Sequence, residues 1–338
     1  MKMKAVVYES AKKMVIKEVP IPRPQKNQVL LKIKACGICG TDIHLLSGVY
    51  EGKMPLIPGH EASGEVIELG SEVKFIKIGD RVAVDPNVGC GYCEFCQRGR
   101  AHLCKYQQPF GVFRAGAFAE YAVIEETHAY KIPDTMTYEQ GSMVEPVACC
   151  LRGAQLSRYK VGDSVFIHGA GAIGNMNMQI ARVSGATKIT ISDPLAKRRE
   201  LALKLGADYA IDPTAPSFDK DYRKIYPDGA DVVMECAGRT ALTGKSVLMA
   251  KRGGIVVAFG CAPIGEFTQI SPEYINSNEI TICGSYNNPY TNGPAIDLIS
   301  SGRINVDALI THKFGIVDFQ KGLDTFGTSD ALKVVIVP

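Results

Sequence analysis

Residues 164–174 read SVFIHGAGAIG, an apolar run that leads directly into three glycines with the spacing G-x-G-x-x-G. The run predicts a strand, and residues 172–185 predict the helix that follows it. Gly169, Gly171 and Gly174 suit a turn between the two elements that binds a pyrophosphate. Such glycines permit a tight turn, close approach of the phosphate and close packing of the helix on the sheet. The helix N-terminus adds N–H groups that attract the phosphate charge. The stretch therefore predicts a dinucleotide-binding unit.

The residues that follow repeat this alternation of strand and helix. The predicted strands lie at 188–193, 230–238 and 254–260, and the first two lead into predicted helices at 196–207 and 240–253. Continuous apolar strands that alternate with helices are typical of a parallel, doubly wound sheet with both faces covered. We therefore expect an α/β fold in this half of the chain.

The strand predicted at 188–193 ends at Asp193, about 20 residues beyond the glycine loop. A carboxylate at this place can accept hydrogen bonds from both ribose hydroxyls of a dinucleotide, and it would repel a 2′-phosphate. Asp193 therefore favours NAD over NADP. The cations Lys197, Arg198 and Arg199 lie close by in the sequence and leave the choice open.

The first 130 residues have a different texture, rich in short β-branched runs between glycines and prolines. Residues 28–35 alternate apolar and charged side chains, which predicts a half-buried strand. Residues 136–157 predict a helix that kinks near Pro146. A further helix at 295–302 and a strand at 332–338 end the chain, outside the strand–helix alternation.

Composition limits the classes of protein to which the chain can belong. A length of 338 residues suggests two domains, and 46% hydrophobic with 22% charged residues is typical of a globular protein. The net charge of +3 is too small for the basic field that non-specific nucleic-acid binding needs. We expect no membrane span and no signal peptide, because no apolar run is long enough. Five of the 11 cysteines have metal-ligand contexts, so we expect a cytoplasmic protein with thiolate-bound metal.

Four of these cysteines lie close together, at Cys90, Cys93, Cys96 and Cys104. Four thiolates can surround one Zn²⁺ as a closed tetrahedron, which leaves no position for a substrate. The alternative is an iron–sulfur cluster, whose usual motif has three residues before the fourth cysteine and a proline after it. Here the gap is seven residues and Lys105 follows. A DNA-binding zinc finger is disfavoured, because no histidine pair follows the cysteines. We expect a structural zinc site.

A second set of candidate metal ligands is spread along the chain. Cys39 and His60, about 20 residues apart, offer a thiolate and an imidazole. Glu61 or Glu145 could complete a three-ligand site that keeps one position for water or substrate. The spacing alone leaves other interpretations open, since a lone thiol or acid is often structural. Cys36 is a competing thiol three residues before Cys39.

Several segments occur together in an order typical of one family. They are GICGTDIH at 37–44, PGHEASGEV at 58–66, GDRVAVDP at 79–86, GCGYCEFC at 89–96, GAFAEYAV at 116–123, EPVACCLRG at 145–153 and GAGAIG at 169–174. With these motifs the chain resembles the zinc-containing medium-chain dehydrogenase/reductase superfamily, and within it the polyol (sorbitol-like) and threonine dehydrogenases. The resemblance implies a GroES-like catalytic domain at 1–148, a Rossmann NAD-binding domain at 149–288 and a return to the catalytic domain at 289–338. It also implies a homodimer or homotetramer.

The resemblance implies two zinc ions, one catalytic and one structural in the four-cysteine lobe. Cys39, His60 and Glu61 match the ligands of the catalytic ion. Glu145 matches an acid that binds this zinc directly or through water, and the sequence leaves open which of the two glutamates is the ligand. Asp42 matches a residue that orients the ligand histidine.

The resemblance also implies a proton relay and a cofactor site. Thr41 and His44 match the hydroxyl and the imidazole that carry the substrate proton to solvent. Ile173, Asp193 and Arg198 match positions that contact the adenosine half of NAD. The implied reaction is hydride transfer from a secondary hydroxyl of a polyol or sugar alcohol to NAD.

Two departures from the family patterns bear on the substrate. Sorbitol-type enzymes carry an arginine in a G-x-[FY]-R segment, where this chain has GSYNN with Asn287. The helix of the threonine enzymes reads EPLGNAVH, where this chain has EPVACCLRG. A pentitol or a related sugar alcohol, free or phosphorylated, fits both departures. Threonine or a simple alcohol remains an alternative, as does a nucleotide-binding zinc protein without catalysis. A zinc-free quinone reductase would lack the lobe and the GHE motif.

Overall fold

The computed structural model describes residues 1–338 and divides them into two units. Unit 1 contains Met1–Ala148 and Asn287–Pro338, and unit 2 contains Cys149–Tyr286. The boundary between Ala148 and Cys149 lies within helix α4 (Val144–Ser157). None of the helices combines the length and the apolar character that crossing a membrane requires.

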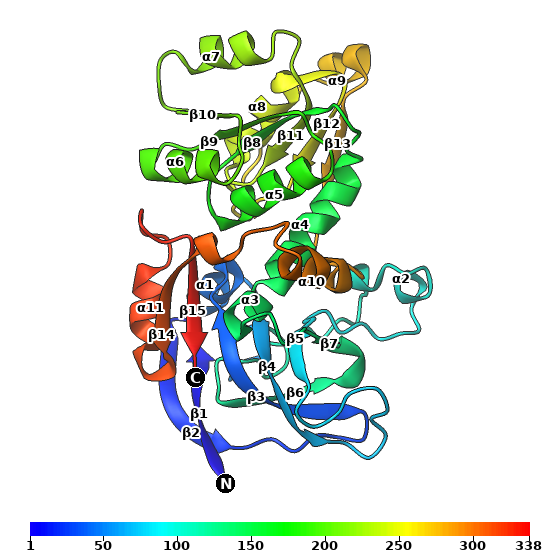
Figure 1. Ribbon diagram of the computed structural model, residues 1–338, viewed down its shortest axis with the longest axis vertical. Helices are drawn as coiled ribbons and strands as arrows, with labels where there is room; N and C mark the ends of the chain where they lie inside the picture. Colours follow the sequence, from blue (N-terminus) through cyan, green and yellow to red (C-terminus); the bar gives the residue numbers. More distant parts are fainter. The chain divides into compact units, whose positions relative to one another are not determined.

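Unit 2 contains a sheet of six parallel strands (Figure 1). The strands are β8 (Ser164–His168), β9 (Lys188–Ser192), β10 (Tyr209–Ile211), β11 (Ala230–Glu235), β12 (Ala250–Ala258) and β13 (Thr281–Gly284). Their order across the sheet is β10-β9-β8-β11-β12-β13, so the chain runs to one edge, returns beside β8 and continues to the other edge. This order is that of a doubly wound dinucleotide-binding sheet, and it confirms the predicted fold class of this half.

Helices cover both faces of this sheet (Figure 1). On one face lie α5 (Ala172–Val183) and α6 (Ala196–Lys204), and on the other lie α7 (Phe218–Ile225), α8 (Thr240–Met249) and α9 (Pro272–Asn278). Successive side chains of a strand point to opposite faces. Val165 and Ile167 therefore pack in the core with α5 and α6, and Phe166 packs in the core with α7 and α8. Burial on both faces explains why these strands are continuously apolar.

Unit 1 contains a β-hairpin, β1 (Lys2–Ser10) with β2 (Lys13–Pro20), and a seven-stranded sheet. The sheet strands are β3 (Gln28–Gly37), β4 (Glu61–Leu69), β5 (Arg81–Val84), β6 (Tyr121–Glu125), β7 (Ala129–Lys131), β14 (Ile310–Gly315) and β15 (Lys333–Val337). The helices are α1 (Gly40–Ser47), α2 (Glu94–Gln97), α3 (Tyr138–Ser142), α10 (Asn292–Ser300) and α11 (Phe319–Thr325). Strand β15 pairs antiparallel with β3, which brings the end of the chain beside its first segments (Figure 1).

The predicted kink near Pro146 is wrong. The segment forms two helices, because α3 ends at its C-cap Met143 and α4 begins at Val144. Pro146 lies in the first turn of α4, where a residue has no helical N–H bond to lose. The proline therefore fits a helix start and does not bend a helix that is already formed.

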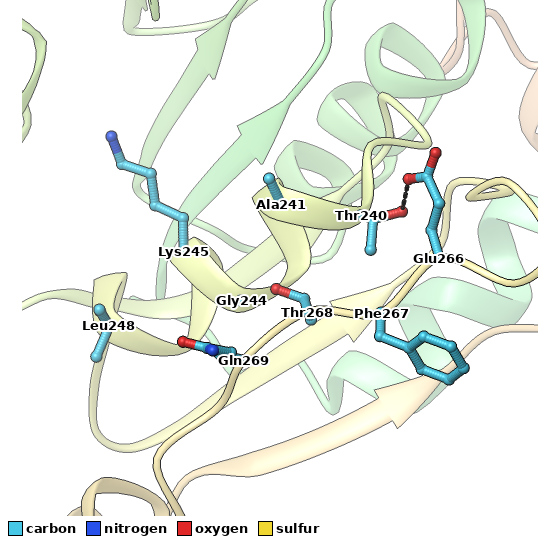
Figure 2. Close-up of a pocket in the computed structure, with 9 residues that line it drawn as sticks. All are labelled: Thr240, Ala241, Gly244, Lys245, Leu248, Glu266, Phe267, Thr268 and Gln269. Carbon is cyan, nitrogen blue, oxygen red and sulfur yellow. Dashed lines mark hydrogen bonds between the residues drawn. The ribbon is translucent and has the colours of Figure 1, made fainter.

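Unit 2 has a pocket of about 520 Å³ between α8 and the segment from Glu266 to Gln269 (Figure 2). Thr240 donates a hydrogen bond to Glu266 at its rim, at 2.6 Å. None of the residues predicted to bind metal or cofactor lines this pocket.

Candidate metal and cofactor sites

The pairing of β3 with β4 brings together residues that are distant in the sequence. Gly37, the last residue of β3, lies opposite Glu61, the first residue of β4. Cys39 follows β3 as the N-cap of α1, and His60 directly precedes β4. The strand register therefore collects a thiol, an imidazole and a carboxylate at one end of the two strands.

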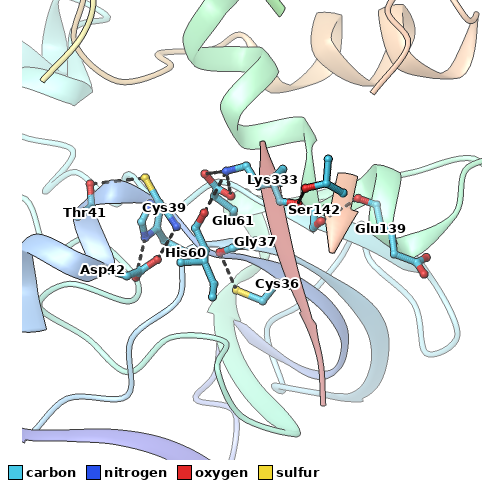
Figure 3. Close-up of polar contacts among 12 residues, drawn as sticks. Cys36, Gly37, Cys39, Thr41, Asp42, His60, Glu61, Glu139, Ser142 and Lys333 are labelled. Carbon is cyan, nitrogen blue, oxygen red and sulfur yellow. Dashed lines mark hydrogen bonds and ion pairs between the residues drawn. The ribbon is translucent and has the colours of Figure 1, made fainter. Parts of the chain in front are cut away.

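Cys39, His60 and Glu61 form one group of candidate metal ligands (Figure 3). Their ligand atoms all lie within 4.8 Å of one another, and His60 and Glu61 are buried. A thiolate, an imidazole and a carboxylate are all zinc ligands, so the donor set fits a zinc ion that keeps one position open. Glu145 is not in this group, although it is buried in the first turn of α4. The competing thiol Cys36 is also outside the group.

Asp42 connects α1 to the candidate ligands. Its Oδ2 accepts the backbone N–H of Cys39 at 2.9 Å, and its Oδ1 lies 3.6 Å from Nδ1 of His60. Burial by itself would lower the pKa of His60, but the charges of Asp42 and Cys39 outweigh burial and raise this pKa. Asp42 thus favours a fixed orientation of the ring and leaves the other ring nitrogen for a metal.

Lys333 is the residue of this site that sequence reasoning missed. Its Nζ donates to Oε1 and Oε2 of Glu61 at 2.7 and 2.6 Å, and to the carbonyl of Ile38 at 3.2 Å (Figure 3). The lysine is 5% exposed. Val335 lies opposite Gly37 in the β15–β3 pair, and continuing this register leads Lys333 to the strand end that carries the ligands. The one signal in the sequence is a lysine that begins an otherwise apolar strand.

The two residues of the predicted proton relay lie on α1, half-buried. Thr41 accepts a weak hydrogen bond from Sγ of Cys39 at 3.7 Å. His44 is three residues further on, which places it on the same face of the helix. Its ring lies against Tyr50, with 4.8 Å between the ring centroids. The hydroxyl is thus next to the candidate ligands, and the imidazole is one turn away.

The four cysteines of the lobe form a second group, with all four sulfur atoms within 4.8 Å of one another. Cys96 lies 3.6 Å from Cys93 and 4.0 Å from Cys90, sulfur to sulfur. A tetrahedral zinc ion with Zn–S bonds of about 2.3 Å separates its sulfurs by about 3.8 Å. Backbone N–H groups of Cys90 and Tyr106 donate to Cys104, at 3.4 and 3.3 Å. The spacing fits one ion better than a cluster, in which separate iron atoms bind the cysteines.

The thiols of the lobe also differ in acidity. A backbone hydrogen bond from Cys96 lowers the pKa of Cys93 to about 6, whereas burial raises the pKa of Cys96 to about 12. Neighbouring thiolates repel one another, so all four sulfurs ionise together only when a cation balances them. The chemistry of the lobe therefore fits a metal ion.

The glycine loop follows β8 and ends in α5, as the sequence predicts. Gly169 has a φ of +92°, which favours glycine. A Cβ atom on Gly174 would overlap the carbonyl oxygen of Gly169. A Cβ atom on Gly171, by contrast, would meet nothing within 4 Å. The fold explains the first and third glycines, and the open space at the second fits an approaching pyrophosphate. Ile173 lies in the first turn of α5.

Asp193 is buried and fixed beside this loop. Its Oδ2 accepts the N–H of Ala170 and its Oδ1 accepts the N–H of Leu195, both at 2.9 Å. Arg198 lies 4.0 Å from Oδ2, and Arg199 donates to the carbonyl of Asp193 at 2.7 Å. The carboxylate keeps further lone pairs for ribose hydroxyls, and Arg198 is a cation close to the same carboxylate oxygen.

Comparisons with known proteins span both units. Residues 25–134 match the family model of the alcohol dehydrogenase GroES-like domain, and residues 172–301 match that of the zinc-binding dehydrogenases. The D-arabinitol dehydrogenase 1 of Uromyces fabae is 33% identical over 340 residues, which cover 99% of this chain and 97% of that protein. The L-threonine 3-dehydrogenase of Alteromonas mediterranea is 34% identical over 342 residues, which cover 99% of both.

Solved structures give the same result. A crystal structure of a zinc-binding dehydrogenase from Sinorhizobium meliloti 1021, bound to NADP, is 39% identical, covers 100% of both chains and has a TM-score of 0.96. The predicted combination of a GroES-like domain with a Rossmann sheet is therefore confirmed.

Proposed function

Because the chain belongs to the zinc-binding dehydrogenase family, we propose that it oxidises a secondary hydroxyl of a polyol or sugar alcohol and transfers the hydride to NAD. One observation carries the proposal, namely the difference between the two groups of metal ligands. The cysteines of the lobe form a closed set of four, whereas Cys39, His60 and Glu61 are three donors that leave a position for a substrate oxygen. We assign the structural zinc to the lobe and the catalytic zinc to the three donors.

The residues around the catalytic site have distinct tasks in this reaction. Bound zinc supplies a Lewis acid that lowers the pKa of a coordinated hydroxyl. Asp42 holds the ring of His60, and Thr41 accepts the hydroxyl proton while releasing its own. His44 passes the proton to solvent, since an imidazole can both accept and donate a proton. Glu61 is the preferred third ligand, because its carboxylate is in the group and that of Glu145 is not.

We assign NAD to the loop of unit 2. The space at Gly171 and the position of the Asp193 carboxylate support a dinucleotide whose ribose hydroxyls are unmodified. The structure from Sinorhizobium meliloti contains NADP, so the test must include both cofactors. Because relatives of this family imply a homodimer or homotetramer, we propose one of these states, which sedimentation of the purified protein will distinguish.

Initial rates test the proposal. We expect reduction of NAD with one member of a panel of sugar alcohols and their phosphates, and loss of this activity with a chelator. Cys39→Ala should abolish turnover, and Cys36→Ala, a change of the neighbouring thiol outside the ligand group, should retain it. Full activity of Cys39→Ala would contradict the catalytic site. No reduction with any compound, in protein shown to carry zinc, would favour a nucleotide-binding zinc protein without catalysis.

Threonine is the second candidate substrate, because the threonine enzymes match the chain as closely as the arabinitol enzyme does. Threonine and a simple secondary alcohol therefore belong in the same panel. A kcat/KM for threonine above that for every polyol would replace the polyol assignment and leave the metal and cofactor sites unchanged.

A further inference from the structure

Lys333 is a buried cation at the candidate catalytic site. Its side chain is 6% exposed and that of Glu61 is 2% exposed. An ammonium group is costly to bury unless a charge and hydrogen bonds compensate it. The two oxygens of Glu61 and the carbonyl of Ile38 supply three acceptors, which match the three N–H donors of the lysine. The three acceptors therefore satisfy every N–H donor of the buried lysine.

The fold fixes the Glu61 carboxylate from the other side as well. A Cβ atom on Gly37 would overlap the oxygen Oε2, so a side chain at this position of β3 would displace the carboxylate from its place. The same carboxylate lies within 4.8 Å of the ligand atoms of Cys39 and His60. Glu61 is thus held within reach of two cations, the ammonium group and a metal ion.

We infer that Lys333 competes with the catalytic metal for the carboxylate of Glu61. A metal that binds Glu61 must share or replace oxygens that accept from Lys333. The ammonium group also repels a divalent cation across this short distance. Lys333 therefore lowers the affinity of the site for its metal. Lys333 is a positioning residue, since it acts on the metal through Glu61. The inference rests on the proposed function only for the presence of a metal at this site.

The test is a zinc titration of the metal-free full-length protein at pH 8 in competition with a chromophoric chelator. The binding step that Cys39→Ser removes belongs to the catalytic site, and the remaining step belongs to the lobe. In Lys333→Met we expect the dissociation constant of the catalytic step to fall at least about tenfold, which corresponds to about 1.4 kcal/mol. The step assigned to the lobe should not change. Lys313→Met is the matched control, because this lysine of β14 is exposed and pairs with Glu139.

Two further measurements separate competition from general damage. Lys333→Gln keeps an N–H donor for Glu61 but removes the charge, so it should also tighten zinc binding. This variant replaces Lys333→Met in the test if Lys333→Met folds poorly. In a Glu61→Gln background, Lys333→Met should tighten binding less than it does in the wild type, because the shared carboxylate is gone. A cobalt-substituted sample should show a changed ligand-field spectrum in Lys333→Gln.

The outcomes are distinguishable. If the wild type binds zinc at the catalytic site and both Lys333 variants bind it there equally tightly or more weakly, this inference is wrong and the proposed function is unaffected. If Lys333→Met tightens zinc binding equally in the wild type and in the Glu61→Gln background, Lys333 does not act through competition for Glu61. If the wild type has no step that depends on Cys39, both the inference and the proposed catalytic site are wrong.

Discussion

Asp42 shows how one buried side chain serves two elements. One oxygen caps α1 through the N–H of Cys39, and the other lies at ion-pair distance from His60. The residue has no exposed surface, so solvent cannot replace either interaction. The position of the thiol and the orientation of the imidazole therefore depend on the same carboxylate.

We predict that Asp42→Asn lowers the affinity of the catalytic site for zinc by about 10–100-fold, because the ligand histidine loses its charged partner. Partial loss of the helix cap should cost about 1 kcal/mol of unfolding free energy. Chelator competition and urea denaturation measure the two effects. The control is Asp134→Asn, whose side chain is fully exposed. Unchanged zinc affinity in folded Asp42→Asn would contradict the role of Asp42.

We propose that Asp193 favours NAD over NADP, and a variant can test this. In Asp193→Ser the repulsion of a 2′-phosphate disappears and Arg198 remains. We predict that the ratio of kcat/KM for NADP to that for NAD rises at least about tenfold. The N–H groups of Ala170 and Leu195 lose their acceptor, so both cofactors should bind more weakly and only the ratio is diagnostic.

Asp212→Asn is the control for this prediction. This carboxylate pairs with Arg199 at 3.3 Å and accepts no hydrogen bond from the loop. The variant changes the local charge by the same amount. If it shifts the cofactor ratio as much as Asp193→Ser does, the effect comes from general electrostatics and not from a contact of Asp193.

At the scale of elements, the lobe is notable for its lack of regular structure. Between β5 and β6 the only α-helix is α2, which has four residues and none of them buried. Thirty-odd residues without a core of their own need another source of stability, and we propose that thiolate–metal bonds supply it. On this proposal the metal ion organises the lobe.

We predict that Cys93→Ser lowers the unfolding free energy by about 3 kcal/mol or more, because an incomplete ligand set releases the loop. Thermal unfolding and limited proteolysis measure this loss, and cleavage should occur between Cys90 and Cys104. The folded fraction should keep its kcat. Cys261→Ser is the control, since this exposed cysteine lies outside both ligand groups. A Cys93→Ser protein with wild-type stability and full zinc content would contradict a structural lobe.

Local signals explain which elements the sequence could predict. The strand β8, the glycine loop and α5 are consecutive, so apolar periodicity and three glycines suffice to identify them. The prediction of a kink near Pro146 failed because a proline in the first turn of a helix and a proline at a kink give the same sequence pattern. Candidate ligands such as Cys39 and His60 came from residue type and family resemblance, since their proximity depends on the register of β3 with β4.

The whole molecule determines what no local pattern could indicate. Lys333 and Glu61 are 272 positions apart, and they meet only because β15 adds to β3. The core of unit 1 likewise combines residues from both ends of the chain, among them Val6, Leu31, Phe319 and Ile336. Unit 2, by contrast, consists of one continuous segment, Cys149–Tyr286. The two units should therefore differ in whether they can fold from a single piece.

We predict that a fragment of residues 149–286 folds and binds NADH, whereas a fragment of residues 1–148 does not fold. The first fragment contains all six strands of the parallel sheet and both of its cores. The second lacks β14 and β15, which leaves Cys36 and Gly37 at the end of β3 without their partner strand and the buried Glu61 without Lys333. Circular dichroism and NADH fluorescence measure folding and binding.

A matched variant connects this prediction to the cofactor loop. In the fragment of residues 149–286, Gly171→Ala should unfold at the same temperature as the parent, because its Cβ meets no protein atom. It should bind NADH about tenfold more weakly or worse, because the Cβ occupies the space of the pyrophosphate. If the parent fragment and its Gly171→Ala variant bind NADH with equal affinity, the open space at Gly171 is not where the dinucleotide binds. A fragment of residues 149–286 that fails to fold would show that its two cores depend on unit 1, although no residue of unit 1 belongs to them.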